Sequence, residues 1–102
     1  MRASKSLFLF AVLLFAVPAI SFAASYSFSR SLTLGSRGED VLVLQQFLNA
    51  RGFLVASAGA GSPGNETDYF GSLTRATVAR YQASENISPA VGYFGPLTRA
   101  YV

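Results

Sequence analysis

One ten-residue segment occurs twice in this chain of 102 residues. Residues 69–78 read YFGSLTRATV and residues 93–102 read YFGPLTRAYV, so eight of the ten positions are identical at an offset of 24 residues. Each copy reads as an aromatic turn, a glycine and the start of a helix. Because repeats usually mark structural units that stack to bury a core, we expect two equivalent turn–helix units related by pseudo-symmetry. The pattern alone is equally consistent with a structural repeat that binds nothing.

The first 23 residues have the pattern of a secretory signal peptide. Arg2 and Lys5 precede a continuous apolar run over residues 7–17, and Pro18 ends that run. Ser21 and Ala23 place small side chains at the positions that a signal peptidase recognises, so we expect cleavage after Ala23. This feature predicts an exported protein of the cell envelope, either periplasmic or extracellular.

The rest of the chain is long enough for one small domain. We expect a short polar tether over residues 24–30 and a single domain over residues 31–102. The apolar run near the N-terminus is shorter than the ~20 residues that a spanning helix needs. Residues 19–24 lengthen it, however, so an uncleaved membrane anchor stays open as the alternative to a cleaved signal.

The charge balance argues against a nucleic-acid-binding surface. After residue 23 the chain has six arginines and five acidic residues, so most of the net charge of +3 belongs to the predicted signal peptide. A basic stripe of the kind that nucleic acids require is not present. The chain also has no cysteine, which leaves aliphatic and aromatic packing as the source of its stability.

The spacing of apolar residues predicts a first helix over residues 37–51. Ser36 and Glu39 have the spacing of a capping box at its start, and Gly52 suits the left-handed residue that follows a helix. The expected apolar face consists of Val41, Leu44, Phe47 and Leu48.

Two further helices are expected after a long, flexible, glycine-rich loop over residues 56–65. The second begins near Gly71 or Ser72 and ends near Ala83. A third, shorter helix begins near Pro96, because proline suits the first helical position. The apolar surface of the second helix is expected from Leu73, Ala76, Val78 and Tyr81. We therefore predict an all-α fold, a small three-helix bundle.

Catalysis is not expected from this chain. It has no histidine and no cysteine, so the commonest zinc ligands, the usual general base and the thiol nucleophile are missing. Glu39 and Asp40 are acids at a helix start, where they favour the helix dipole. Asp68 is expected to cap the second helix or the turn before it. We predict a protein that is not an enzyme and that needs neither a metal nor a cofactor.

Ligand binding requires aromatic faces and hydrogen-bond donors, and the repeat supplies both. Tyr69 and Tyr93 can each present an apolar face and a hydroxyl, and the guanidinium groups of Arg75 and Arg99 suit carboxylates. The alternative for the tyrosines is packing against a neighbouring helix start, and for the arginines a solvated face or a cap on another helix. The phenylalanines of the repeat, which follow the tyrosines directly, are expected in the core.

Two glutamines border the predicted apolar faces. Partly buried amides must find hydrogen-bond partners, so we expect Gln45 to bind backbone groups of the adjoining turn, and we expect a similar structural role for Gln82. Thr74 and Thr98 are expected to form local hydrogen bonds within the first turn of their helices.

The ordered set of these residues resembles the peptidoglycan-binding-like domain family. The run LGSRGEDV at residues 34–41, with Leu44, Gln45, Leu48 and Gly52, is similar to its first helix. The run DYFG at residues 68–71 and the run GYFGPLT at residues 92–98 are similar to the entries of its second and third helices. The resemblance implies a three-helix bundle that binds bacterial peptidoglycan.

The resemblance leads to a concrete functional hypothesis. We expect non-catalytic binding to peptidoglycan, through its glycan strand, its stem peptide or both, with a monomer as the expected state. The expected contacts are Tyr69, Tyr93, Arg75 and Arg99, with Asp68 as a partner for an amino or amide group of the stem peptide. The alternative is a secreted protein-interaction or assembly module that keeps the bundle without a sugar site.

Overall fold

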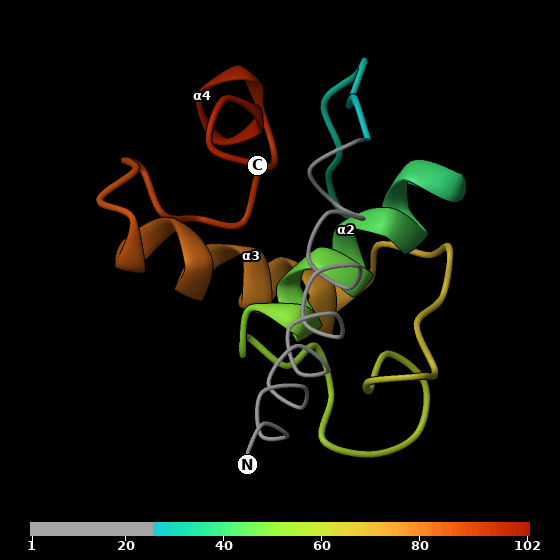
Figure 1. Cartoon of the computed structure of the whole chain (residues 1–102). Coiled ribbons are helices and arrows are strands. Elements are labelled where there is room, and N and C mark those ends of the chain that lie inside the picture. Colours follow the sequence, from blue (N-terminus) through green and yellow to red (C-terminus); the bar gives the residue numbers. More distant parts are fainter. Residues whose placement is uncertain (1–25) are drawn as a thin grey trace, which may run out of the picture.

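Three helices form the regular structure of residues 26–102, the part of the chain that the computed structural model describes (Figure 1). They are α2 (Glu39–Ala50), α3 (Ser72–Ser84) and α4 (Pro96–Arg99). Within this part no strand forms, and β-pairing is limited to two isolated bridges. The predicted all-α class with three helices is confirmed. The predicted signal peptide lies outside the described residues.

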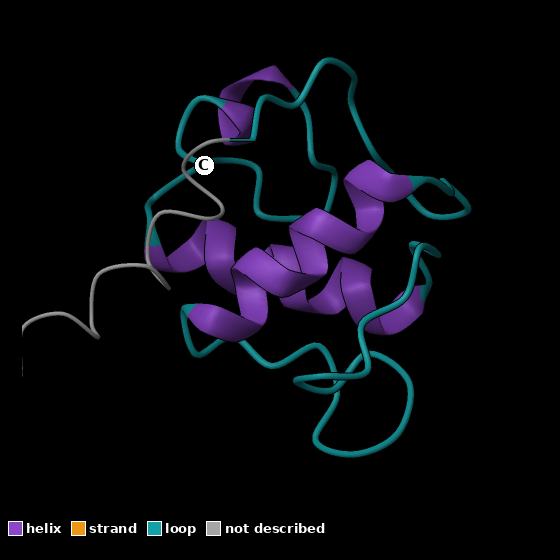
Figure 2. Cartoon of the chain, turned by 45° about the vertical axis from the view of Figure 1, so that its right-hand side comes forward, coloured by secondary structure: helices purple, strands orange, loops and turns teal. Residues whose placement is uncertain are grey.

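The two longer helices pack against each other, and the short α4 lies to one side of them (Figures 1 and 2). Their shared core is rich in aromatic rings. Tyr81 of α3 makes edge-on contacts with Phe47 and Phe53, each with ring centroids 5.6 Å apart. Phe70 and Phe94 are fully buried, as the repeat predicted.

The start of α2 differs from the prediction. Gly38 is the residue before the helix, with φ of 144°, and no side chain of residues 26–102 caps the helix. The capping box was therefore wrong. The reason lies in the hydrogen bonds of Ser36: its hydroxyl accepts from the Thr33 amide at 3.0 Å, while its carbonyl accepts from the Phe70 amide at 2.9 Å. Because Ser36 pairs with the second half of the chain, α2 begins at Glu39, two residues later than predicted.

The ends of α2 and α3 share one geometry. At the end of α2 the Gly52 amide donates to the Asn49 carbonyl, and the Phe53 amide donates to the Leu48 carbonyl at 2.9 Å. This is the Schellman arrangement, and Gly52 occupies its left-handed position with φ of 89° as predicted. Asn86 takes the same position after α3, with φ of 60°.

The buried face of α3 is more polar than predicted. Leu73 is 57% exposed and Ala76 is also exposed, so neither forms the apolar face expected for them. The buried positions of α3 are instead Thr74, Thr77, Val78, Tyr81 and Gln82. The helix turns this face inward because its polar groups have partners there: the Thr77 hydroxyl, for example, bonds to the carbonyls of Leu54 and Leu73.

One short segment before α2 is hydrogen-bonded to both repeated turns. Leu32 and Phe94 exchange backbone hydrogen bonds, each 2.9 Å long. A few residues later the Gly35 amide donates to the Phe70 carbonyl at 2.8 Å, and the Gly38 amide donates to the Asp68 carbonyl at 3.0 Å. Residues 32–38 therefore connect the two turn–helix starts.

The residues before this segment also contact the domain. The Phe28 ring packs edge-on against Phe94, with centroids 5.0 Å apart. The Arg30 guanidinium donates to both carboxylate oxygens of Asp40, at 2.7 and 3.0 Å, and to the Arg37 carbonyl at 2.6 Å. The hydrogen bond from Arg30 holds the pKa of Asp40 below its ordinary value of 3.8.

The Arg30–Asp40 pair predicts a pH dependence of stability. A carboxylate whose pKa is lowered in the folded state stabilises the fold above its unfolded pKa, and this contribution disappears as pH falls through the folded value. We expect Asp40→Asn and Arg30→Gln to lower the free energy of unfolding at neutral pH by the same amount, because each removes the same ion pair. As the pH falls below 3.8, the difference from the unaltered chain should disappear. Urea denaturation across this range measures it, and additive effects in the double variant would contradict the pairing.

Gly92 predicts a second, larger stability effect. Its φ is 92°, and a Cβ added there would lie 2.5 Å from both the Cγ and the carbonyl oxygen of Arg75. Gly92→Ala combines left-handed strain with overpacking and should cost about 3 kcal/mol or more. Gly52→Ala is the matched control, because its φ is 89° but its added Cβ meets nothing within 4 Å; we expect about 1 kcal/mol. Equal urea midpoints would contradict this account.

Candidate functional site

Two cavities lie beside the two repeated turn–helix starts. Each is lined by the tyrosine and glycine of its repeat copy and by the side chains of the helix that follows. Tyr69 is 40% exposed and Tyr93 is 49% exposed. The repeat therefore places one accessible tyrosine at each cavity. We call these cavities the Tyr69 pocket and the Tyr93 pocket.

A buried glutamine from the preceding helix fixes the Tyr69 turn. The side-chain amide nitrogen of Gln45 donates to the Tyr69 carbonyl and to the Thr74 hydroxyl, both at 2.9 Å. Its amide oxygen accepts from the backbone amide of Thr67 at 2.7 Å. A single side chain from α2 therefore bonds to the turn before α3 and to the first turn of α3 itself.

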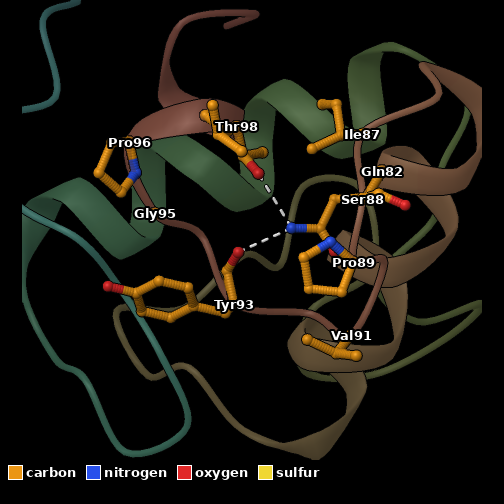
Figure 3. Close-up of a pocket in the computed structure, with 10 residues that line it drawn as sticks. Gln82, Ile87, Ser88, Pro89, Val91, Tyr93, Gly95, Pro96 and Thr98 are labelled. Atoms are coloured by element: carbon orange, nitrogen blue, oxygen red, sulfur yellow. Dashed lines mark hydrogen bonds between the residues drawn. The ribbon is translucent and has the colours of Figure 1, made fainter.

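Gln82 of α3 makes a closely similar set of bonds to the Tyr93 turn (Figure 3). Its amide nitrogen donates to the Tyr93 carbonyl at 2.7 Å and to the Thr98 hydroxyl at 2.9 Å. Its oxygen accepts from the Gly92 amide at 2.9 Å. The structural role predicted for both glutamines is confirmed. Thr74 and Thr98, by contrast, bond across to these glutamines, so the local hydrogen bonds expected for them were wrong.

The backbone before each helix has the same conformation in both copies. Gly71 has φ −102° and ψ −166°, and Gly95 has φ −103° and ψ −165°. Glycine is required here for space. A Cβ on Gly71 would lie 2.9 Å from the Tyr69 ring, and one on Gly95 would clash with the Tyr93 ring. Each tyrosine ring therefore rests against the glycine two residues after it, which fixes the ring's position.

The Tyr93 pocket has a volume of about 210 Å³ and a mainly apolar lining. Figure 3 shows the side chains around it, with the Gln82 amide bonded to Tyr93 and Thr98. The turn between α3 and α4 supplies one wall, and the start of α4 supplies the other. The apolar lining side chains are Ile87, Pro89, Val91, Pro96 and Leu97.

The Tyr69 pocket is of similar size, about 240 Å³, and is more polar. Thr67 and Ser72, two residues with hydroxyl side chains, are part of its lining, and Ala60 and Gly61 form part of its wall. That wall belongs to the long loop between α2 and α3. The two pockets thus share one framework but differ in lining.

Asn49 holds the loop wall in place, a role that the sequence analysis missed. Its amide nitrogen donates to the Gly61 carbonyl at 3.0 Å and to the Glu66 carboxylate at 2.8 Å, and its oxygen accepts from the Val55 amide at 2.8 Å. Burial tends to raise the pKa of Glu66, but hydrogen bonds from Asn49 and the Gly64 amide outweigh it and lower that pKa. The available signal was spacing, because Asn49 lies one helical turn after Gln45.

The sequence-predicted contacts do not form a single cluster. Tyr69 and Tyr93 line different pockets. Arg75 lies beside the Tyr93 pocket, where its Nε contacts the Val91 carbonyl at 3.4 Å. Arg99 lines neither pocket, and its buried Nε has no hydrogen-bond partner among the described residues.

Asp68 has a different place from the one expected. Its carboxylate is 3.7 Å from Arg37 and 63% exposed, and its carbonyl accepts from Gly38. The residue before α3 is Gly71, and no side chain in the described part of the chain caps that helix. The predicted capping role for Asp68 was therefore wrong.

Arg37 is the second residue that sequence reasoning missed. Its guanidinium lies over the Tyr69 ring, 4.3 Å from the centroid. No pattern in the sequence pointed to this contact, because it depends on the bridge that pairs Arg37 with Tyr69 across the chain.

The described residues contain no group of three or more histidine, cysteine or acidic side chains that could hold a metal ion. Likewise, no helix in residues 26–102 is long and apolar enough to cross a membrane. The residues that line the two pockets have aromatic, apolar and hydroxyl side chains.

Comparison with known families agrees with this arrangement. Residues 37–100 match the family described as "Putative peptidoglycan binding domain". The match covers more than half of the chain, so the chain belongs to this family, as the resemblance in its sequence predicted. Neither the curated proteins nor the solved structures that were searched contain a match.

The glutamine bonds predict a specific loss of stability. Gln82→Leu keeps the side-chain volume roughly constant but leaves the Gly92 amide, the Tyr93 carbonyl and the Thr98 hydroxyl without their partner. Unpaired buried groups cost about 1–3 kcal/mol each, so we expect a total loss of at least about 3 kcal/mol. Gln46→Leu is the control, since Gln46 is half-buried and has no side-chain hydrogen bond within the described residues. Equal urea midpoints for the two variants would contradict the account.

Proposed function

We propose that this chain binds bacterial cell-wall peptidoglycan, without catalysis, as an exported module of the cell envelope. Membership of the peptidoglycan-binding family supports the ligand class. The signal-peptide pattern of residues 1–23 supports export. The observation that carries the proposal is the half-exposed Tyr93 ring beside an open, apolar pocket.

The geometry at Tyr93 suits a sugar residue with an apolar face. One part of the ring rests against Gly95, and the rest faces solvent. Such a ring offers an apolar surface for stacking and a hydroxyl for a hydrogen bond. The pocket behind it, lined by Pro96 and Leu97, has room for a small apolar group such as an acetyl methyl. Because Gln82 already holds the turn in place, binding costs little conformational entropy.

Arg75 is the proposed charged contact of this pocket. Its side chain packs along Gly92 and its Nε approaches the Val91 carbonyl, so the exposed guanidinium stays near the pocket wall. A guanidinium there can bind a lactyl carboxylate of the glycan strand. Tyr69, Asp68 and Arg99 lie outside the Tyr93 pocket, and we propose them as further contacts of a polymeric ligand.

A secreted protein-interaction module is the second candidate. Leu73 and Leu97 are more than half exposed, each beside one of the pockets, and exposed apolar side chains in such positions also suit a protein partner. The two candidate functions differ in the ligand that the chain binds. A wall-binding module binds purified, protein-free sacculi, and an interaction module does not.

Co-sedimentation with protein-free sacculi tests the proposal, with cellulose and chitin as controls. We expect selective retention by sacculi that survives moderate salt. Tyr93→Ala should weaken retention about tenfold, because an aromatic contact is worth about 1–1.5 kcal/mol, and Arg75→Ala should weaken it with unchanged helicity. Tyr101→Ala is the matched control, an exposed tyrosine that lines neither pocket. A folded chain that is not retained would overturn the proposal.

A further inference from the structure

The two repeat copies place different side chains at equivalent points of their pockets. Ser72 and Pro96 correspond at the 24-residue offset, as do Thr67 and Val91. Each of these residues lines the pocket of its own copy. Substitution of two hydroxyl side chains for two apolar ones makes the Tyr69 pocket suited to a more polar ligand group than the Tyr93 pocket.

The charged groups near the pockets differ as well. Over the Tyr69 ring lies the Arg37 guanidinium, 4.3 Å from the centroid, whereas no cation is found over the Tyr93 ring in the described residues. With one face covered in this way, Tyr69 offers less surface for sugar stacking. Arg37 does not itself line the Tyr69 pocket, but the Tyr69 ring that it covers does. A ligand that spans this ring can therefore contact the Arg37 cation, the tyrosine hydroxyl and Ser72.

The Arg37 guanidinium is held in place yet has donors to spare. Its backbone is fixed by the bond from Arg30 to its carbonyl, and its side chain is held by the Tyr69 ring. Its closest carboxylate, that of Asp68, is 3.7 Å away, which is beyond hydrogen-bond distance. A guanidinium has five N–H donors, and within the described residues none of those on Arg37 is used in a side-chain hydrogen bond. A bidentate carboxylate can therefore bind here.

We propose that the Tyr69 pocket and Arg37 form a second ligand site, which takes a carboxylate-bearing group of the peptidoglycan stem peptide. This inference rests on the proposed function and adds a division of labour. The Tyr93 pocket binds the glycan strand, and the Tyr69 site binds the peptide. Asp68, exposed beside Arg37, accepts from an amide or ammonium group of the same peptide.

Two sites that bind different parts of one polymer raise the overall affinity. The second contact becomes intramolecular once the first has formed, and avidity can then exceed either affinity by about 100-fold or more. The backbone bonds at Leu32 and Gly35 place the two turns only three residues apart along one segment. Such a segment spans at most about 11 Å, so neighbouring parts of one ligand can reach both turns.

Soluble probes separate the two sites in a titration of the purified chain. The first probe is a peptide-free glycan strand, and the second is the free stem peptide. We expect Arg37→Gln to weaken peptide binding at least tenfold and to change glycan binding by less than twofold. Tyr93→Ala should do the reverse. Arg51→Gln is the matched control, because Arg51 also lies over an aromatic ring, at 5.0 Å from Phe47, and faces Glu85 at 4.0 Å, yet lines neither pocket.

The outcomes distinguish the two proposals. If the chain binds the glycan but not the peptide, or if Arg37→Gln leaves peptide binding unchanged, the second site is rejected and the proposed function stands. If neither probe nor sacculi bind the folded chain, the proposed function fails and the second site fails with it.

Exchange of Ser72 for proline gives a further check, since proline is tolerated at the first helical position. Ser72→Pro should weaken peptide binding with unchanged helicity, and unchanged peptide binding would count against the site.

Discussion

The two buried glutamines attach the two repeated turns of this small domain to the helices that precede them. Gln45 reaches from α2 to the start of α3, and Gln82 reaches from α3 to the start of α4. Each glutamine uses both ends of its amide, so each turn is attached to the helix before it through groups that are costly to bury unpaired. The chain has no disulfide to do this. Polar bonds at fixed positions, added to a small aromatic core, therefore set the geometry of both pockets.

The same framework leads to two different surfaces. In both copies the tyrosine ring rests on a glycine and the backbone before the helix is the same within a degree. The differences arise from residues that the framework does not need, such as Ser72 in place of Pro96, and from Arg37, which the first copy gains through pairing with a distant segment. Shared construction with altered lining is a simple way for one short chain to contact two chemically different parts of a polymer.

The sequence predicts much of this fold because its strongest signals are local. The helix stop at Gly52 depends on one left-handed residue, and the inward Phe70 beside the outward Tyr69 follows from neighbouring positions in an extended turn. The spacing of apolar residues, with proline at a helix start, was sufficient to predict three helices, and the glutamine partners followed from the need to satisfy buried amides.

The features that escaped prediction depend on contacts between distant segments. Ser36 does not cap α2, because its hydroxyl accepts from Thr33 while its carbonyl pairs with Phe70. Leu73 faces outward because Thr74 and Thr77, on the polar side of α3, have partners inside the fold. Arg37 over Tyr69 is a contact of the same kind. The separation of the candidate residues into two pockets likewise could not be predicted. The repeat shows that its two copies are equivalent, but it does not show how far apart they lie in the fold.

The most direct test of this account is an NMR titration of the labelled chain with soluble muropeptides released from sacculi. The account predicts that the largest shift changes fall on two groups of amides, one around Gly92 and Tyr93 and the other around Thr67 and Tyr69, together with the side-chain amides of Gln82 and Gln45. Shifts confined to other surfaces, or none at all in a folded sample, would contradict it.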